Sequence, residues 1–180
     1  DTFTDLGILM VLIIILVFIV MAAQFESLVD PFVIMFSIPF AFTGIVLGLA
    51  VTQTPLGVMA LIGVIMLMGI VVKNGIVLID YTILCRERGM GIITSVVTAG
   101  KSRLRPVLMT TLTTVLGMIP MAVGTGEGSE MWRSMGMTVA WGLSVSTLIT
   151  LIIVPTVYAV FAANGVKRRR RKIRKALRNN

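Results

Sequence analysis

Long apolar runs separated by short polar segments are the dominant pattern along this chain of 180 residues. A helix needs about 20 predominantly apolar residues to cross the hydrocarbon core of a membrane. Five runs are long enough, and they predict a bundle of five transmembrane helices within residues 1–163. The predicted spans are residues 6–23, 31–51, 58–84, 106–123 and 134–163.

The segments between the first three spans carry helix-starting and turn signals. Asp30 and Pro31 fit the N-cap and the first helical position of the second span. Residues 52–57 have the turn chemistry that separates the second span from the third. Within the second span, Gly44 and Gly48 have the Gly-x-x-x-Gly spacing that lets another helix approach closely. Relief of local crowding is the alternative reading of these glycines.

Residues 86–105 interrupt the pattern, because they hold five basic residues, one acidic residue and a single short apolar stretch, residues 92–97. That stretch is too short to span a membrane. It fits an interfacial helix, between the third and fourth spans, that turns apolar side chains toward lipid and basic ones toward the head groups. Residues 164–180 form a second basic segment, a tail with nine Lys and Arg.

The composition indicates an integral membrane protein of the all-α class. Hydrophobic residues make up 57% of the chain and charged residues 13%, and the mean hydropathy is +1.01, more apolar surface than a soluble domain of this size can hide. The chain has no His and one Cys, which excludes an internal disulfide and a recognisable soft-metal site. It also lacks a nucleophile with a base and a phosphate-binding loop, so we expect neither an enzyme nor a bound cofactor.

The basic residues predict the orientation in the membrane. All Lys and Arg except Lys73 and Arg133 lie in residues 86–105 or in the tail, and two spans separate these segments, so both lie on one side. The positive-inside rule makes that side cytoplasmic and places the N-terminus outside. Anionic lipid explains the tail better than nucleic acid does, because the tail lacks interleaved aromatic residues and a folded scaffold.

Lys73 is the most informative residue, since it lies near the middle of an otherwise apolar span. No other charge occurs between Pro31 and Val72, and the next one is Asp80. A charged side chain at this depth costs a few kcal/mol and persists where it faces protein or water and finds a partner. Asp80 lies about 10 Å further along the same helix, so it cannot pair with Lys73 directly. The counter-charge is expected from another helix or from a segment outside this chain.

Uncharged polar residues near Lys73 complete a candidate proton relay. A lysine whose carboxylate partner binds and releases protons can change partners, and so convert a proton gradient into helix movement. For a threonine, the alternative is a hydroxyl that only bonds to a carbonyl of its own helix. The candidates are Asn74, beside Lys73, and Thr110, Thr111, Thr113 and Thr114 of the fourth span.

Several sequence blocks, in this order and at about these distances, resemble resistance-nodulation-division efflux transporters along essentially the whole chain. The resemblance is to the last five membrane helices, the eighth to twelfth, of a hydrophobe/amphiphile exporter of the multidrug type. The heavy-metal branch matches less well, because the 13 Met form no pattern that can be assigned to metal. The blocks are Met21–Ser27, Pro39, Gly69–Asp80 with its Lys-Asn pair, Arg103–Thr111 with its Arg-Leu-Arg-Pro run, and Pro120 before Gly124–Gly126.

The resemblance implies a proton/substrate antiporter that works as a homotrimer in the inner membrane of Gram-negative bacteria, joined to a periplasmic adaptor and an outer-membrane channel. It places a relay lysine at Lys73, an arginine at Arg103 and a threonine at Thr110; Asn74 and Asp80 are the other polar candidates. The aspartate pair of the family's relay lies in the N-terminal half of the transporter, outside this chain. Residues 130–133, Glu-Met-Trp-Arg, depart from the smaller and more neutral residues of the best-known pumps, which leaves the subfamily open.

Two other readings compete with a transporter. A non-transporting assembly or protein-secretion accessory subunit of the same superfamily also uses a six-helix bundle, but the missing sixth span and the Lys-Asn pair argue against it. A lipid-anchored scaffold explains the basic tail and leaves Lys73 unexplained. Because the chain begins at Asp1, with neither an initiator Met nor a basic signal region, we expect it to be a piece of a longer protein.

Overall fold

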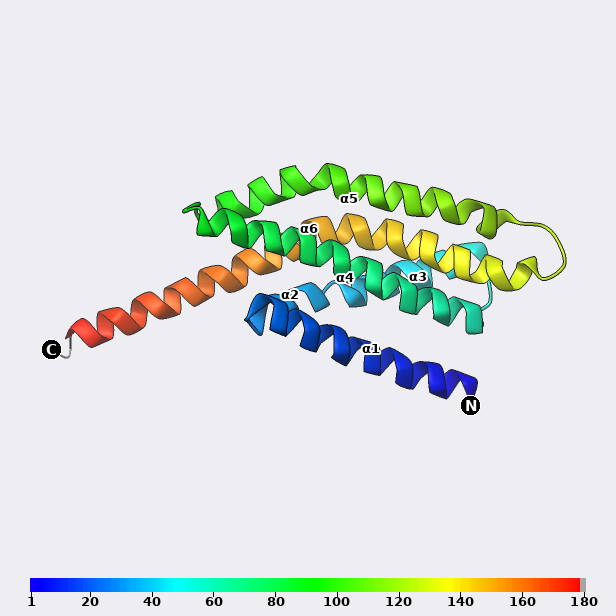
Figure 1. Cartoon of the computed structure of the whole chain (residues 1–180), viewed down its shortest axis with the longest axis horizontal. Helices are drawn as coiled ribbons and strands as arrows, with labels where there is room; N and C mark the ends of the chain where they lie inside the picture. Colours follow the sequence, from blue (N-terminus) through cyan, green and yellow to red (C-terminus); the bar gives the residue numbers. More distant parts are fainter. Residues whose placement is uncertain (179–180) are drawn as a thin grey trace.

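Six α-helices build the structure, a computed structural model that describes residues 1–178 and, of these, all side chains except those of residues 168–170 and 175–178. Five segments are long and apolar enough to cross a membrane, which confirms the predicted number of spans. Figure 1 shows these segments arranged along one long axis, with the end of α6 extending beyond the bundle. The helices are α1 (Thr2–Phe25), α2 (Val29–Met35), α3 (Ile38–Thr52), α4 (Val58–Glu87), α5 (Ile92–Val123) and α6 (Ser129–Arg178).

The second predicted span consists of two helices, α2 and α3, which together are long enough to cross a membrane. The chain breaks at Phe36 and Ser37, and Pro39 occupies the first turn of α3. Proline has no backbone N–H and its ring collides with the preceding turn, so the helix ends before it and restarts with the proline in place. The buried Ser37 hydroxyl donates a hydrogen bond of 2.6 Å to the Ile34 carbonyl, which satisfies it in the apolar interior.

Residues 92–105 are helical, but they continue into the fourth span instead of forming a separate interfacial helix. The chain turns after α4 at Gly89, whose φ is 87°, and α5 then runs on through Pro106. An internal proline removes one helical hydrogen bond and bends a helix without ending it, and the α5 ribbon bends along its length (Figure 1). Likewise, α6 joins the fifth span and the basic tail into one helix of 50 residues that contains Pro155.

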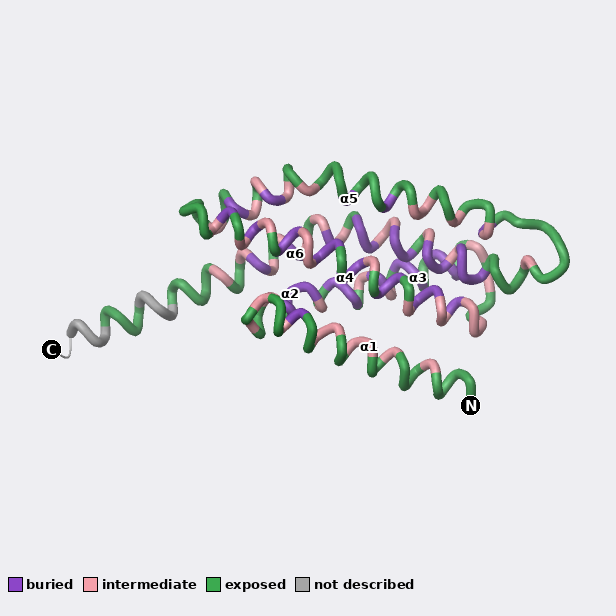
Figure 2. The backbone as a smooth tube through the Cα atoms, in the orientation of Figure 1, coloured by how far each residue is buried: buried purple, intermediate pink, exposed green. Residues whose placement is uncertain are grey.

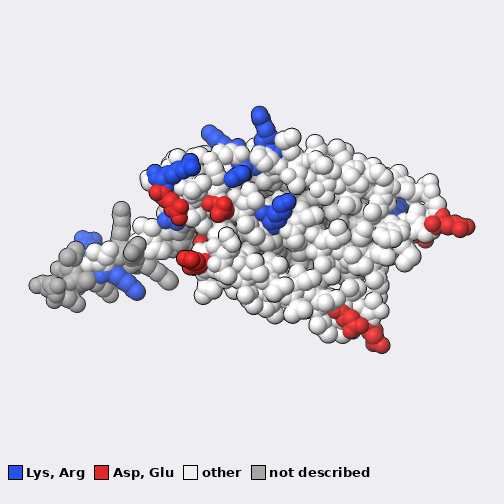
Figure 3. Space-filling model, viewed as in Figure 1, with Lys and Arg blue, Asp and Glu red and all other residues white. Residues whose placement is uncertain are grey.

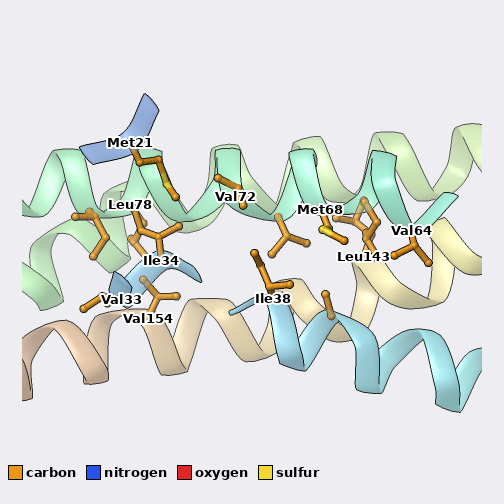
Figure 4. Close-up of a cluster of buried hydrophobic side chains, with 14 of the residues drawn as sticks. Met21, Val33, Ile34, Ile38, Val64, Met68, Val72, Leu78, Leu143 and Val154 are labelled. Atoms are coloured by element: carbon orange, nitrogen blue, oxygen red, sulfur yellow. The ribbon is translucent and has the colours of Figure 1, made fainter. Parts of the chain in front are cut away.

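The helix α6 packs against α3, α4 and α5, whereas α1 lies mainly against α2 and α4. Buried residues are concentrated in α3, α4 and the middle of α6, and α1 and α5 are exposed over most of their length (Figure 2). The hydrophobic core contains residues of all six helices; Figure 4 shows Met21, Ile34, Met68 and Leu143 among them. Since lipid is as apolar as these side chains, close packing rather than escape from water holds such a bundle together.

Gly44 and Gly48 lie at the contact between α3 and α6, which confirms that this spacing marks a close helix approach. A Cβ atom added to Gly44 would lie 2.8 Å from the Cβ of Val145, and one added to Gly48 would collide with Trp141. On the opposite side of the contact, a Cβ atom at Gly142 would lie 2.8 Å from Cγ1 of Ile45. A side chain at Gly44 or Gly48 would therefore require the two helices to move apart, and one at Gly142 would require Ile45 and the end of Leu67 to shift.

Candidate functional site

Lys73 lies on a face of α4 that points away from the packed core. Its side chain is exposed, although Val71, Val72 and Asn74 around it are buried. Asp80 is exposed on the same side, as its spacing of two helical turns requires. Apart from Glu87, its last residue, the exposed positions of α4 recur at helical spacing and lie along one side, which we call the outer stripe: Met66, Gly69, Lys73, Asp80 and Leu84.

The outer stripe has no covering element in the described part of the chain. No ion pair involving Lys73 or Asp80 is formed among the described residues. The stripe is otherwise apolar, and Lys73 sits near the middle of a helix of 30 residues. A lone ammonium group at that depth is stable only against protein or water that holds a partner for it.

Asn74 does not share this face. Successive residues of a helix are rotated by about 100°, and Asn74 is only 7% exposed on the core side of α4. The structure therefore separates Asn74 from Lys73, although the two are neighbours in the sequence. Asn74 can position α4 within the bundle, but it does not contact a partner that approaches the outer stripe.

Arg103 connects α5 to α4 through an aromatic ring. Its guanidinium carbon lies 4.7 Å from the ring centre of Tyr81, a cation–π arrangement. The Arg103 Nε is buried and has no hydrogen-bond partner among the described residues. Tyr81 follows Asp80 directly, so Arg103 is held next to the end of the outer stripe. In the sequence, Tyr81 is marked only by its position directly after Asp80.

The threonines of α5 fall into two groups. Thr110 is exposed, and its hydroxyl donates a hydrogen bond of 2.9 Å to the Pro106 carbonyl of the same helix. Thr114 bonds in the same way, at 2.8 Å, to the carbonyl of Thr110. Thr111 alone reaches another helix, because its buried hydroxyl lies 3.1 Å from that of Thr147 on α6. Thr110 is thus exposed and bonded within its own helix, and Thr111 contributes to the α5–α6 contact.

Sequence comparisons show the family to which the chain belongs. Residues 2–162 match the model of the AcrB/AcrD/AcrF family. The chain is 43% identical over 163 residues to the swarming motility protein SwrC of Bacillus subtilis, an alignment that covers 90% of the chain and 16% of SwrC. It is 38% identical over 143 residues to the multidrug resistance protein MdtC of Erwinia tasmaniensis, covering 79% of the chain and 14% of MdtC.

A solved structure shares the fold of the chain. The crystal structure of a heavy metal efflux pump superposes with a TM-score of 0.79 at 29% sequence identity, covering 87% of the chain and 15% of the pump. The chain therefore spans only about one sixth of the length of the proteins it matches.

Proposed function

Since this chain belongs to the AcrB/AcrD/AcrF family of resistance-nodulation-division transporters, we propose that it forms part of the membrane-spanning region of a proton-driven multidrug efflux pump. The pump activity belongs to a longer protein, because the chain spans 16% of SwrC and 14% of MdtC. Within that protein, the five spans correspond to the eighth to twelfth membrane helices. The non-transporting accessory subunit remains the alternative function.

One observation carries this proposal: Lys73 is exposed in mid-span on the outer stripe, whose only other charged member is Asp80, two turns away. A membrane protein retains such a lysine where a further element supplies its counter-charge. We assign Lys73 as the cation of a proton relay whose carboxylates come from the N-terminal half of the transporter. In this relay, we assign Arg103 and Thr110 of α5 as further members, Asp80 shares the stripe of Lys73, and Asn74 holds α4 from the core side.

The proposed substrates are amphiphilic organic compounds, in keeping with the name of the relative MdtC. Export of metal ions is the second candidate, and the likeness to the heavy metal efflux pump favours it. We place the protein in the bacterial inner membrane as a homotrimer, with the basic tail in the cytoplasm, and joined to a periplasmic adaptor and an outer-membrane channel. The loop charges support this orientation.

The test uses the longer protein that contains this chain, reconstituted in liposomes with a proton gradient. When an amphiphilic dye is supplied, we expect the protein to carry protons across the liposome membrane. Proton flux is followed with a pH-sensitive fluorophore inside the liposomes. Zinc and cobalt ions serve as the comparison, and flux with these ions alone would assign the protein to metal export. No flux with either substrate class would favour the accessory subunit. The 180-residue chain alone is expected to give no flux, because it lacks the carboxylates that would cycle Lys73.

The orientation predicts the outcome of reporter fusions at four positions. An enzyme that is active only outside the cytoplasm should work when fused after Thr54 and Gly128, and should fail when fused after Gly89 and Lys172. A cytoplasmic reporter at the same four positions should give the complementary pattern. High activity of the external reporter at Gly89 would contradict this topology.

A further inference from the structure

One end of the bundle contains a groove of about 980 Å³ between the turns that connect the helices. Its walls come from the α1–α2 turn, the end of α4, the α4–α5 turn and the part of α6 that leaves the bundle. Basic and acidic residues adjoin one another at this end of the molecule, from which α6 extends (Figure 3). The proposed relay at Lys73 is not part of the groove.

The positions of the charged residues along their helices place this groove at the depth of the lipid head groups. Asp30 directly precedes the apolar part of the second span, and Arg86 and Glu87 directly follow the apolar part of α4. Apolar side chains line the same groove, among them Ile83 and Phe161. Charged groups beside apolar walls at the membrane surface suit a ligand with a polar head and hydrocarbon chains.

The groove contains both positively and negatively charged side chains. The guanidinium of Arg86 is half-buried and donates a hydrogen bond of 3.0 Å through Nη1 to the Tyr158 hydroxyl, which fixes it in the groove. Asp30 is half-buried and lies within electrostatic range of Arg86. Glu87 is exposed on the groove wall. The groove thus offers one fixed guanidinium for an anion and two carboxylates for a cation.

We propose that this groove binds a phospholipid whose head group carries both a phosphate and a primary ammonium group, as phosphatidylethanolamine does. Arg86 holds the phosphate through the planar donors of its guanidinium. Asp30 and Glu87 accept hydrogen bonds from the ammonium group, and the acyl chains lie along the apolar walls. Phosphatidylglycerol has no ammonium to meet the carboxylates, and the quaternary nitrogen of phosphatidylcholine has no N–H to donate.

The test is native mass spectrometry of the longer protein after extraction from membranes that contain equal amounts of phosphatidylethanolamine, phosphatidylcholine and phosphatidylglycerol with identical acyl chains. The wild-type protein should retain phosphatidylethanolamine preferentially. Loss of one charge-assisted contact should lower this retention about tenfold in Arg86→Gln and in Asp30→Asn. Equal retention of the three lipids, or a preference for phosphatidylglycerol, would overturn the proposal. A structure of the longer protein in which other segments fill the groove would also overturn it.

Two further variants separate a lipid contact from a structural role of Arg86. Arg88→Gln removes an arginine at the same end of the bundle that does not line the groove, so it should retain the lipid like the wild type. Tyr158→Phe removes the hydrogen bond to Arg86 and keeps the guanidinium charge, so retention should fall less than in Arg86→Gln. If Tyr158→Phe lost as much lipid as Arg86→Gln, Arg86 would act only through its packing against Tyr158. If Arg88→Gln lost as much lipid as Arg86→Gln, Arg86 would act only through general surface charge.

Discussion

Replacing Lys73 by alanine is expected to abolish export by the longer transporter while the protein stays folded and inserted in the membrane. The substitution removes the only charge between Pro31 and Asp80. The carboxylates proposed to face Lys73 would then be buried without a counter-ion and would keep a proton throughout the cycle, because burial disfavours an unpaired carboxylate. A carboxylate that cannot release its proton stops the transport cycle, so at equal membrane abundance export by Lys73→Ala should fall to the level of membranes without the transporter.

Three variants define what the Lys73 result means. Lys73→Arg should also fail, because a planar guanidinium does not reproduce the compact geometry of an ammonium group. Thr110→Ala should retain most of the activity, because the lost hydrogen bond to Pro106 lies within its own helix and such a bond contributes about 1 kcal/mol. Lys101→Ala, which removes an exposed lysine at the start of α5, is the matched control and should export normally.

The relay role of Lys73 is wrong if Lys73→Ala exports at the wild-type rate. It is also wrong if the variant is lost because it does not insert, since Lys73 would then be a structural ion-pair partner. Membrane abundance is measured by immunoblotting of the membrane fraction, and trimer content by gel electrophoresis under native conditions.

Gly48→Ala is expected to destabilise the bundle by about 3 kcal/mol, the cost of overpacking a tight contact. The sign of this change in stability is informative, because replacing glycine by alanine inside a helix normally stabilises the helix by about 1 kcal/mol. Here the added Cβ would collide with the Cβ and Cγ atoms of Trp141 on α6, and neither a different rotamer of Trp141 nor a small shift of its ring removes that overlap. Thermal unfolding in detergent, followed by circular dichroism, measures the change.

Gly117→Ala on α5 is the matched control, because no atom lies within 4 Å of the Cβ position there. This variant should be as stable as the wild type or slightly more stable. Trp141→Ala should not rescue Gly48→Ala, because it keeps the colliding Cβ, whereas Trp141→Gly should recover part of the lost stability. A Gly48→Ala protein that unfolds at or above the wild-type temperature would show that α3 and α6 do not meet at Gly48.

The sequence predicted the number of spans, and it offered a close approach at Gly44 and Gly48 as one of two readings. Both depend on local rules, namely the length of apolar runs and the spacing of small residues. It did not predict that residues 92–105 continue into the fourth span. Pro106 fits the first position of a new helix as well as it fits the interior of a bent one, and only the packing of α5 against α4 and α6 selects the second.

The packed face of α4 could not be read from the sequence, because apolar residues surround this helix on all sides and leave no clear period. For this reason the sequence alone groups Asn74 with Lys73, whereas in the structure Asn74 is buried on the core side of α4. Two contacts between helices could not be predicted for the same reason: Arg103 with Tyr81, and Thr111 with Thr147. Both depend on how α5 is aligned with α4 and α6.

The glycine contact also restricts how the bundle can move. Packed helices usually shift by exchanging one fit of side chains for another, but Gly44, Gly48 and Gly142 have no side chains to rearrange. We therefore expect little sliding between α3 and α6, where the backbones meet most closely. If Lys73 changes partners as proposed, we expect the larger displacement at α1, which is the least buried of the five candidate spans.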